Sequence, residues 1–406
     1  MVKLSHLQIG GAFMTGGHVF QAIVAFAINL ILVRYIPPSE FGRFALVFAE
    51  ASLFYAVISI RTNTLIIRAA ESVYDNDAMD VYFNAALQET LLATVLIFVW
   101  LWLTGAVGPW EVTIALTLAV RHWTVLNKAF YERGLPYKQL SFIETGASFS
   151  GHAVSLVVVL IGGGWVALVL REVMQTVVQL LALVKVGGLT IRRVRPLKRH
   201  EYKRLYLESR GVWLDGLLEG TFSRLTIMTA GYVGGDALAG LVFQAQRLAT
   251  APHLVLAPFV NRIVMNWFSR TEDPTARRQG RNRAVWVTIL PLTVGAIAVM
   301  LFAEPLVPWL LGADWQDVSP LLIGMAGLIV FMSPFEVLRS YCIAIHHTRV
   351  VLFARVAQHI GFFVPVALAM AGVMSEGAGL AYGFSAAFAV AFIGIWWLML
   401  YYERRE

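Results

Sequence analysis

The sequence contains a single cysteine, Cys342, and few charged residues: Asp, Glu, Lys and Arg make up 14% of its 406 residues. One cysteine excludes an internal disulfide and a metal cluster built on cysteines. Soluble domains carry about 25% charged residues, whereas 58% of this chain is hydrophobic. The composition therefore indicates a polytopic membrane protein and not a large soluble core.

Catalytic and metal-binding motifs are also missing. Ser, His and Asp do not cluster as a triad, and no Walker-type glycine loop precedes a lysine. His346 and His347 are adjacent, so on a helix they would point apart, and no carboxylate follows at ligand spacing. The loops expected on the outer side are too short to carry a catalytic domain. We therefore expect no enzyme activity, no cofactor and no metal.

Long apolar segments dominate the sequence. A bilayer core of about 30 Å requires about 20 apolar residues per helix, and about twelve segments meet that requirement. The first has full-span length and no small-residue cleavage pattern, so we expect it to remain in the mature protein as a helix. The predicted fold class is an all-α polytopic membrane protein with about 12 transmembrane helices. The expected ranges are about 8–33, 39–60, 80–104, 109–131, 138–161, 164–187, 205–231, 236–262, 284–303, 318–341, 349–372 and 376–401.

The middle of the chain holds a basic run, IRRVRPLKRHEYKR, at residues 191–204, in which Glu201 alone opposes the Lys and Arg residues. Such a run can bind nucleic acid because Lys and Arg neutralise phosphates. Here both flanks are apolar segments, so we interpret it as a cytoplasmic connector and expect no nucleic-acid partner. The predicted division is an N-terminal six-helix lobe at 1–187, a basic connector at 188–204 and a C-terminal six-helix lobe at 205–406.

Lys and Arg collect in alternate loops. The loops near 105–110, 162–164, 231–235, 304–317 and 372–376 contain neither residue, whereas the loops between them carry most of the basic residues. Cytoplasmic loops of membrane proteins are enriched in Lys and Arg. Both termini and the connector are therefore expected to be cytoplasmic, and the connector should also attract anionic headgroups of the membrane lipids.

The two halves resemble each other as a parallel repeat. YIPPS at 35–39 follows the first segment and YVGGD at 232–236 follows the seventh, 197 residues later. This alignment makes Glu50 and Arg247 equivalent positions, each near the middle of a segment. Ionisable residues at that depth face a cavity or another charge, so each is a candidate functional residue. The alternative is an ion pair between Glu50 and Arg247 that has no role toward a substrate.

Three further candidates lie on the seventh segment and one on the fourth. Asp215 and Glu219 are four residues apart and share one helix face. Arg224 lies within reach of the same sector, and Arg121 lies at mid-depth beside His122. The alternative for Asp215, Glu219 and Arg224 is a network within their own helix that serves structure alone.

Three stretches point to a known family. NLILVRYIPPSEFGRF at 29–44 resembles the first hairpin of bacterial polysaccharide exporters, in which Arg and Pro precede an acidic residue, an aromatic residue and Gly. LGADW at 311–315 and YERGLPY at 131–137 are similar to two shorter family stretches, although Leu310 and Leu311 replace the usual Leu-Phe. The exporters belong to the multidrug/oligosaccharidyl-lipid/polysaccharide (MOP) superfamily, which includes the O-antigen (Wzx-type) flippases. The second-half counterpart at 238–240 departs from Phe-Gly.

The resemblance implies two six-helix lobes around a central cleft lined by the first, second, seventh and eighth segments, in the bacterial inner membrane. It also implies an undecaprenyl-diphosphate-linked oligosaccharide as the substrate partner. On this basis Arg247, Arg224 and Arg121 are the predicted substrate-binding residues, since guanidinium groups bind phosphate oxygens in pairs. The predicted ion-coupling residues, for a proton or a sodium ion, are Glu50, Asp215 and Glu219.

Two other functions fit the same pattern. An ion-coupled multidrug or small-molecule antiporter of the superfamily would share the fold, but an exporter of cations should have an acidic cavity. A membrane enzyme of surface-glycan assembly would need larger outer loops than this chain has.

Overall fold

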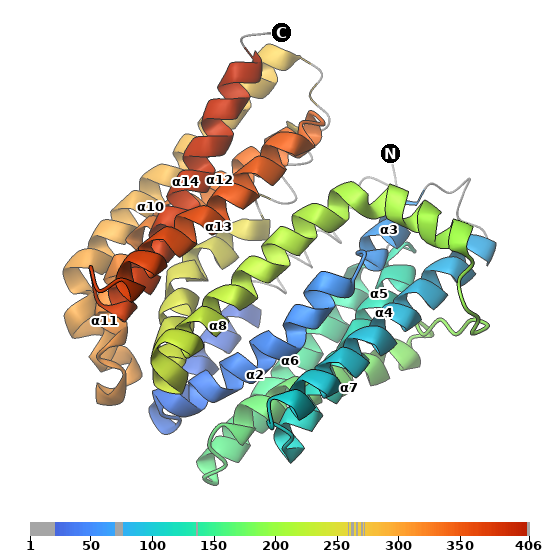
Figure 1. Cartoon of the computed structure of the whole chain (residues 1–406), viewed down its shortest axis with the longest axis horizontal. Coiled ribbons are helices and arrows are strands. Elements are labelled where there is room, and N and C mark those ends of the chain that lie inside the picture. Colours follow the sequence, from blue (N-terminus) through green and yellow to red (C-terminus); the bar gives the residue numbers. More distant parts are fainter. Residues whose placement is uncertain are drawn as a thin grey trace. The chain divides into compact units, whose positions relative to one another are not determined.

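The computed structural model of the chain describes residues 21–69, 76–134, 137–258 and 273–403, together with a few single positions from 260 to 271 (Figure 1). Within these ranges the chain forms helices joined by short loops, and no residue is assigned to a strand. Most of the first expected segment, and both chain termini, lie outside the described residues.

The helices follow the expected segments closely. Every expected range coincides, over its described part, with a helix or with two consecutive helices. Ahead of α2 lies the apolar helix Gln21–Tyr35. The remaining bounds are α2 Pro38–Ile58, α3 Thr62–Arg68, α4 Asn76–Leu103, α5 Pro109–Glu132, α6 Tyr137–Leu160, α7 Val166–Lys185, α8 Arg199–Pro258, α10 Pro274–Leu311, α11 Val318–Gly324, α12 Ala326–Ala344, α13 Thr348–Met370 and α14 Glu376–Glu403.

Nine helices among the described residues are long and apolar enough to cross a membrane. One of them is α8, which is interrupted by non-helical backbone at Gly234 and Gly235, so it supplies two of the expected segments. Gly235 has a φ of 70°, which glycine adopts without a steric penalty. The helix Gln21–Tyr35 and the more polar α5 account for the other two. The prediction of an all-α polytopic membrane protein is confirmed.

Helix α10 is longer at both ends than the expected range 284–303. Asp273 caps its N-terminus, because the carboxylate accepts hydrogen bonds from the backbone N–H groups of Thr275 and Ala276 at 2.9 and 3.2 Å. At the other end the helix continues to Leu311, through residues predicted as an outer loop. With this side-chain cap, α10 begins at residue 274, ten residues before the start at 284 that hydropathy predicted.

The chain divides into two compact units. The first comprises Met1–Ile36 and Val47–Arg224, and the second comprises Pro37–Leu46 and Leu225–Glu406. This division differs from the predicted six-helix lobes, which stay a prediction. In the first unit α6 packs on α7, and α5 packs on α3, α4 and α7. In the second unit α14 packs on α11, α12 and α13, and α10 packs on α11 and α12.

Two of the family-like stretches meet inside the second unit. Phe41, from the stretch at 29–44, is fully buried and contacts Trp315, from the stretch at 311–315, edge to face with ring centroids 5.3 Å apart. Beside this contact, Gly42 of α2 and Gly240 of α8 bring two backbones together. A Cβ atom on Gly42 would overlap the carbonyl oxygen of Asp236, and one on Gly240 would overlap that of Pro38. These stretches therefore form a packing joint.

The basic connector is docked onto the first unit by buried amides. The fully buried Asn84 of α4 donates to the carbonyl of Arg193 at 2.9 Å and accepts from the N–H of Arg195 at 2.8 Å. Asn127 of α5 accepts from the N–H of Thr190 at 2.7 Å. Leu197 joins the apolar cluster of α3, α4 and α5. The connector is consequently an ordered strap.

An ion pair joins the connector to the start of α8. Arg195 donates two hydrogen bonds to Glu201, at 2.8 and 2.7 Å, and the N–H of Lys198 donates to the same carboxylate. The hydrogen bonds from Arg195 lower the pKa of Glu201 from 4.5 to about 2, against a smaller opposing effect of burial. Because this pKa is depressed, the stabilisation is present above pH 4.5 and is lost as the pH falls through about 2. The ion pair between Arg195 and Glu201 is therefore present at neutral pH.

Replacing Asn84 with Ala is expected to speed tryptic cleavage within residues 192–199 about thirtyfold, because it removes two hydrogen bonds to the connector worth about 1 kcal/mol each. The measurement is the cleavage rate of the purified protein, with fragments identified by mass. Gln316→Ala, at an exposed position of the second unit, is the matched control. Equal cleavage rates in Asn84→Ala and the wild type would contradict the docking.

Candidate functional site

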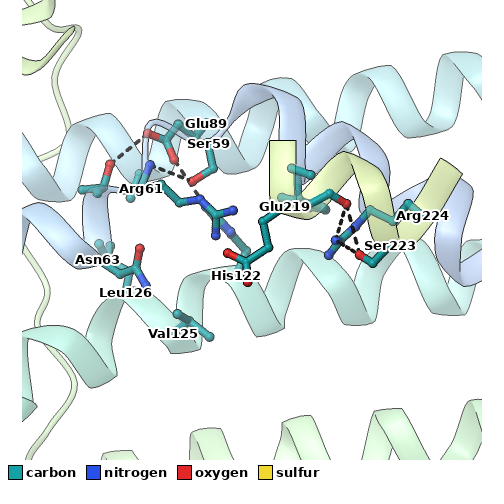
Figure 2. Close-up of a pocket in the computed structure, with 15 residues that line it drawn as sticks. Ser59, Arg61, Asn63, Glu89, His122, Val125, Leu126, Glu219, Ser223 and Arg224 are labelled. Atoms are coloured by element: carbon teal, nitrogen blue, oxygen red, sulfur yellow. Dashed lines mark hydrogen bonds and ion pairs between the residues drawn. The ribbon is translucent and has the colours of Figure 1, made fainter. Parts of the chain in front are cut away.

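A polar cavity of about 500 Å³ lies within the first unit (Figure 2). It lies between the end of α2, the start of α3, α4, α5 and the first part of α8. Five ionisable side chains contribute to its wall, together with hydroxyl and amide groups. The lining residues are Tyr55, Ala56, Ser59, Arg61, Thr62, Asn63, Ala86, Glu89, His122, Val125, Leu126, Glu219, Gly220, Ser223 and Arg224.

Two guanidinium groups stand side by side on one face of α8. Arg61 donates through Nη2 to the carbonyl oxygen of Gly216. Arg224 donates through Nη1 to the carbonyl of Gly220 at 2.6 Å. A Cβ atom on Gly220 would lie 3.5 Å from Nη2 of Arg61 and 3.6 Å from Nη1 of Arg224. Both groups therefore lie within reach of a single small anion.

Glycine spacing on α8 makes this arrangement possible. Gly216 and Gly220 precede Arg224 at intervals of four residues, so all three lie along one face of the helix. A Cβ on Gly216 would collide with the guanidinium of Arg61. Arg224 is held further by Ser52 of α2, whose carbonyl and hydroxyl oxygens accept from Nε at 3.2 and 3.0 Å.

Arg61 itself has an unusual backbone conformation. Its φ of 62° and ψ of 42° lie in the left-handed region, which costs a residue with a side chain more than it costs glycine. The residue joins the end of α2 to α3. Such strain persists only where the surroundings impose it, and it is common at binding sites.

Glu89 imposes much of that conformation. Its Oε1 atom accepts from the hydroxyl of Thr62 at 2.8 Å and from the N–H of Ile60 at 3.3 Å, the two residues that flank Arg61. Its Oε2 atom accepts no hydrogen bond from the described residues and lies 3.5 Å from Nε2 of His122. Glu89 is 8% exposed. One carboxylate thus holds the Arg61 loop and faces an imidazole at the same time.

The cavity can bind an anion. Arg61 and Arg224 carry positive charge, Glu89 and Glu219 carry negative charge, and His122 can carry either no charge or one positive charge. The two guanidinium groups supply planar N–H donors of the kind that bind phosphate oxygens. The two carboxylates offset the charge of the guanidinium groups, which lowers the cost of having those two groups side by side.

The structure brings together only part of the predicted set. Arg224 and Glu219 line the cavity, whereas Asp215, one turn earlier on α8, is outside the lining set. Arg121 forms an ion pair with Glu172 at 2.9 Å. Glu50 accepts a hydrogen bond from Nε1 of Trp100 at 3.0 Å. Arg247 belongs to the second unit. Whether these residues act on a substrate or an ion stays a prediction.

The sequence alone does not indicate Arg61 and Glu89 as candidates for this site. Arg61 is one of the basic residues in the loops expected on the cytoplasmic side, where Lys and Arg set the orientation in the membrane. Glu89 lies in the inner half of its segment, where a carboxylate draws little attention. His122 was noted only as the neighbour of Arg121. The spacing GxxxGxxxR at 216–224 was the available indication, because it opens a helix face beside an arginine.

These observations define an all-α, multi-pass membrane protein with an anion-compatible cavity inside one of its units. The chain belongs to the polysaccharide biosynthesis protein family, which it matches over residues 31–320, well over half of its length. This match confirms the family resemblance of the sequence. No curated protein matches the sequence at a significant level.

The fold is shared with solved transporters. The lipid II flippase MurJ, in an inward closed conformation, is similar with a TM-score of 0.76 and 10% identity, over 95% of this chain and 87% of that chain. An inward-facing multidrug resistance MATE family transporter of the MOP superfamily is similar with a TM-score of 0.66 and 15% identity, over 93% and 97% of the two chains. A variant of a Vibrio cholerae MATE transporter gives 0.60 and 15%, over 100% and 98%. At these identities the likeness shows the fold alone.

Proposed function

We propose that this protein is a flippase that moves an undecaprenyl-diphosphate-linked oligosaccharide from the cytoplasmic to the outer leaflet by alternating access. The glycan would serve O-antigen or exopolysaccharide assembly in the bacterial inner membrane. Membership of a polysaccharide biosynthesis family supports a glycan substrate. The likeness in fold to a lipid II flippase supports a lipid-linked one.

The single observation that carries the proposal is the arginine pair of the cavity. A flippase must bring a diphosphate through a region where an unpaired charge costs several kcal/mol. Nη2 of Arg61 and Nη1 of Arg224 lie 3.5 and 3.6 Å from the point that a Cβ atom on Gly220 would occupy, so both donors are close to the same stretch of α8. Ser59, Asn63 and Ser223 add hydroxyl and amide groups for sugars. The lipid tail would remain in the bilayer.

Several finer features belong to the same proposal. Both termini and the connector lie in the cytoplasm, and the chain is organised as a six-helix lobe at 1–187 and a second one at 205–406. Arg247 and Arg121 contribute further contacts to the diphosphate. Glu50, Asp215 and Glu219 bind a proton or a sodium ion that is coupled to transport. The role of each residue is tested by expressing a variant with that residue substituted in a strain that lacks the gene.

A multidrug antiporter is the second candidate, because the MATE transporters share this fold. Cationic drugs would require a cavity with excess negative charge. The cavity of the first unit has two arginines against two carboxylates, with a histidine in addition. This balance lacks the excess negative charge that a cationic drug would require. A membrane enzyme of glycan assembly is less well supported, since the family and the shared fold both point to transport.

Deleting the gene from its host is expected to trap lipid-linked glycan on the cytoplasmic face, because the diphosphate and the sugars cannot cross hydrocarbon unaided. Re-expression of the wild-type protein should restore surface glycan. The measurement compares lipid-linked glycan accessible to a glycosidase in intact spheroplasts with that in lysed ones. Unchanged surface glycan in the deletion strain, with drug sensitivity increased instead, would favour the antiporter.

A further inference from the structure

We propose that Glu89 and His122 form a proton-binding site that sets the anion affinity of the cavity, so that each bound diphosphate takes up one proton. The inference rests on the proposed function, because it concerns the same arginine pair. It places a proton at Glu89 and His122, to which the proposed function gives no role toward an ion.

The pair is built like a shared protonation site. Oε2 of Glu89 lies 3.5 Å from Nε2 of His122, and the described residues donate no hydrogen bond to it. The imidazole is held against the ring of Tyr55, with centroids 5.0 Å apart and an angle of 32° between the planes. Tyr55 is anchored in turn, because its hydroxyl and that of Thr94 are 2.9 Å apart. A proton taken from water by the pair would convert a long, poorly aligned contact into a charge-assisted hydrogen bond.

The charges around the pair decide the sign of the effect. Arg61 faces it from the start of α3, Glu219 and Arg224 from α8, and the neutral Tyr55 from α2. With His122 neutral, two guanidinium groups balance two carboxylates and the formal charge of the cavity is zero. One added proton makes it +1. Since a diphosphate is an anion, the protonated cavity binds it more tightly, and by linkage diphosphate binding draws a proton in.

The Glu89–His122 pair is also connected to Arg61 through the residues on either side of it. Oε1 of the same carboxylate accepts from Thr62 and Ile60, on either side of the left-handed Arg61. Protonation of the pair therefore changes the charge of the group that positions the Arg61 loop. Glu89 is accordingly a positioning residue as well as a proton acceptor. The proton binds together with the anion in this arrangement, whereas exchange would require the two to compete.

The test uses the full-length purified protein in nanodiscs of uncharged lipid, with farnesyl diphosphate as the probe, at about pH 5.5 and about pH 8, which bracket the range where histidine changes charge. Glu89→Gln keeps an oxygen acceptor for Thr62 and Ile60 but imitates the protonated carboxylate. His122→Gln cannot take up a proton. The probe's own titration is identical in all proteins and cancels when the ratios of Kd at the two pH values are compared.

We expect the wild type to bind the probe more tightly at the lower pH. Its ratio of Kd at the higher pH to Kd at the lower pH should be about fivefold to tenfold larger than the same ratio in either variant. Glu89→Gln should bind tightly at both pH values, since it permanently removes one negative charge from the wall of the cavity, as protonation would. His122→Gln should bind weakly at both. A residue with a purely structural role would weaken binding in both variants.

The proton site would be overturned if the wild type, Glu89→Gln and His122→Gln gave equal ratios of Kd at the two pH values. If Arg61→Gln still lost binding in that case, the role of the arginine pair would remain supported. Absence of farnesyl diphosphate binding by the wild type at either pH would overturn both this inference and the proposed anionic substrate.

Discussion

Replacing Arg224 or Arg61 with Gln is expected to lower glycan export to between about a tenth and a hundredth of the wild-type rate. Each change removes charge-assisted hydrogen bonds to the diphosphate, which are worth about 1.5–3 kcal/mol. The rate is measured as surface glycan regained by the deletion strain at matched amounts of inserted protein. Arg224→Lys should recover part of the activity, because an ammonium group keeps the charge but not the planar fork of donors.

The matched control is Arg210→Gln, which removes an exposed arginine from the same helix, α8, before its apolar part begins. It should export at the wild-type rate. The double variant Arg61→Gln with Arg224→Gln sharpens the test. If both residues bind the same diphosphate, the fold-decrease in export of the double variant should be smaller than the product of the fold-decreases of the two single variants. Wild-type export by Arg224→Gln would remove the main support for the proposed function.

Replacing Gly42 or Gly240 with Ala is expected to lower the melting temperature of the purified protein by about 5–10 °C. The added methyl group overlaps a backbone carbonyl, of Asp236 or Pro38, which no side-chain rotation can relieve. Overpacking of this kind costs about 1–3 kcal/mol, and each kcal/mol shifts the melting temperature by about 2–4 °C in a domain of about 200 residues.

Gly295→Ala is the control for this prediction. Gly295 lies within α10, and a Cβ atom there would meet no other heavy atom within 4 Å. Because alanine is the better helix former, this variant should be as stable as the wild type or slightly more stable. If Gly42→Ala and Gly240→Ala melt like Gly295→Ala, the two glycines do not form a packing joint.

Local patterns predicted the helices well. Apolar length is a property of short segments, and the helices of the structure follow it. The break at Gly234 and Gly235 falls in the loop expected near 231–235. The start of α10 was missed because it depends on one hydrogen-bonded cap, at Asp273, and hydropathy does not detect a cap. The family resemblance came from three short stretches, two of which meet at Phe41 and Trp315.

The candidate site was predicted only where one helix could show it. Arg224 and Glu219 are five residues apart on α8, so they lie within one and a half turns of the same helix. Arg121 was chosen for its depth in the membrane, but depth does not reveal its ion pair with Glu172, which is 51 residues away in the chain. Glu89 and Arg61 were overlooked because their importance depends on each other and on His122.

The sequence by itself determined the class of this protein: membrane-spanning, all-α, and related to the polysaccharide exporters. These conclusions depend on composition, segment length and short stretches, each of which can be judged without knowing what lies beside it. Only the tertiary structure decided which charges share a cavity. Arg61 reaches the backbone of Gly216 across 155 residues of sequence, and the glycine spacing of α8 leaves room for it. Hydrogen bonds and ion pairs form only when the partner atoms lie within about 4 Å, so the chemistry of the site depends on distances that helix packing sets.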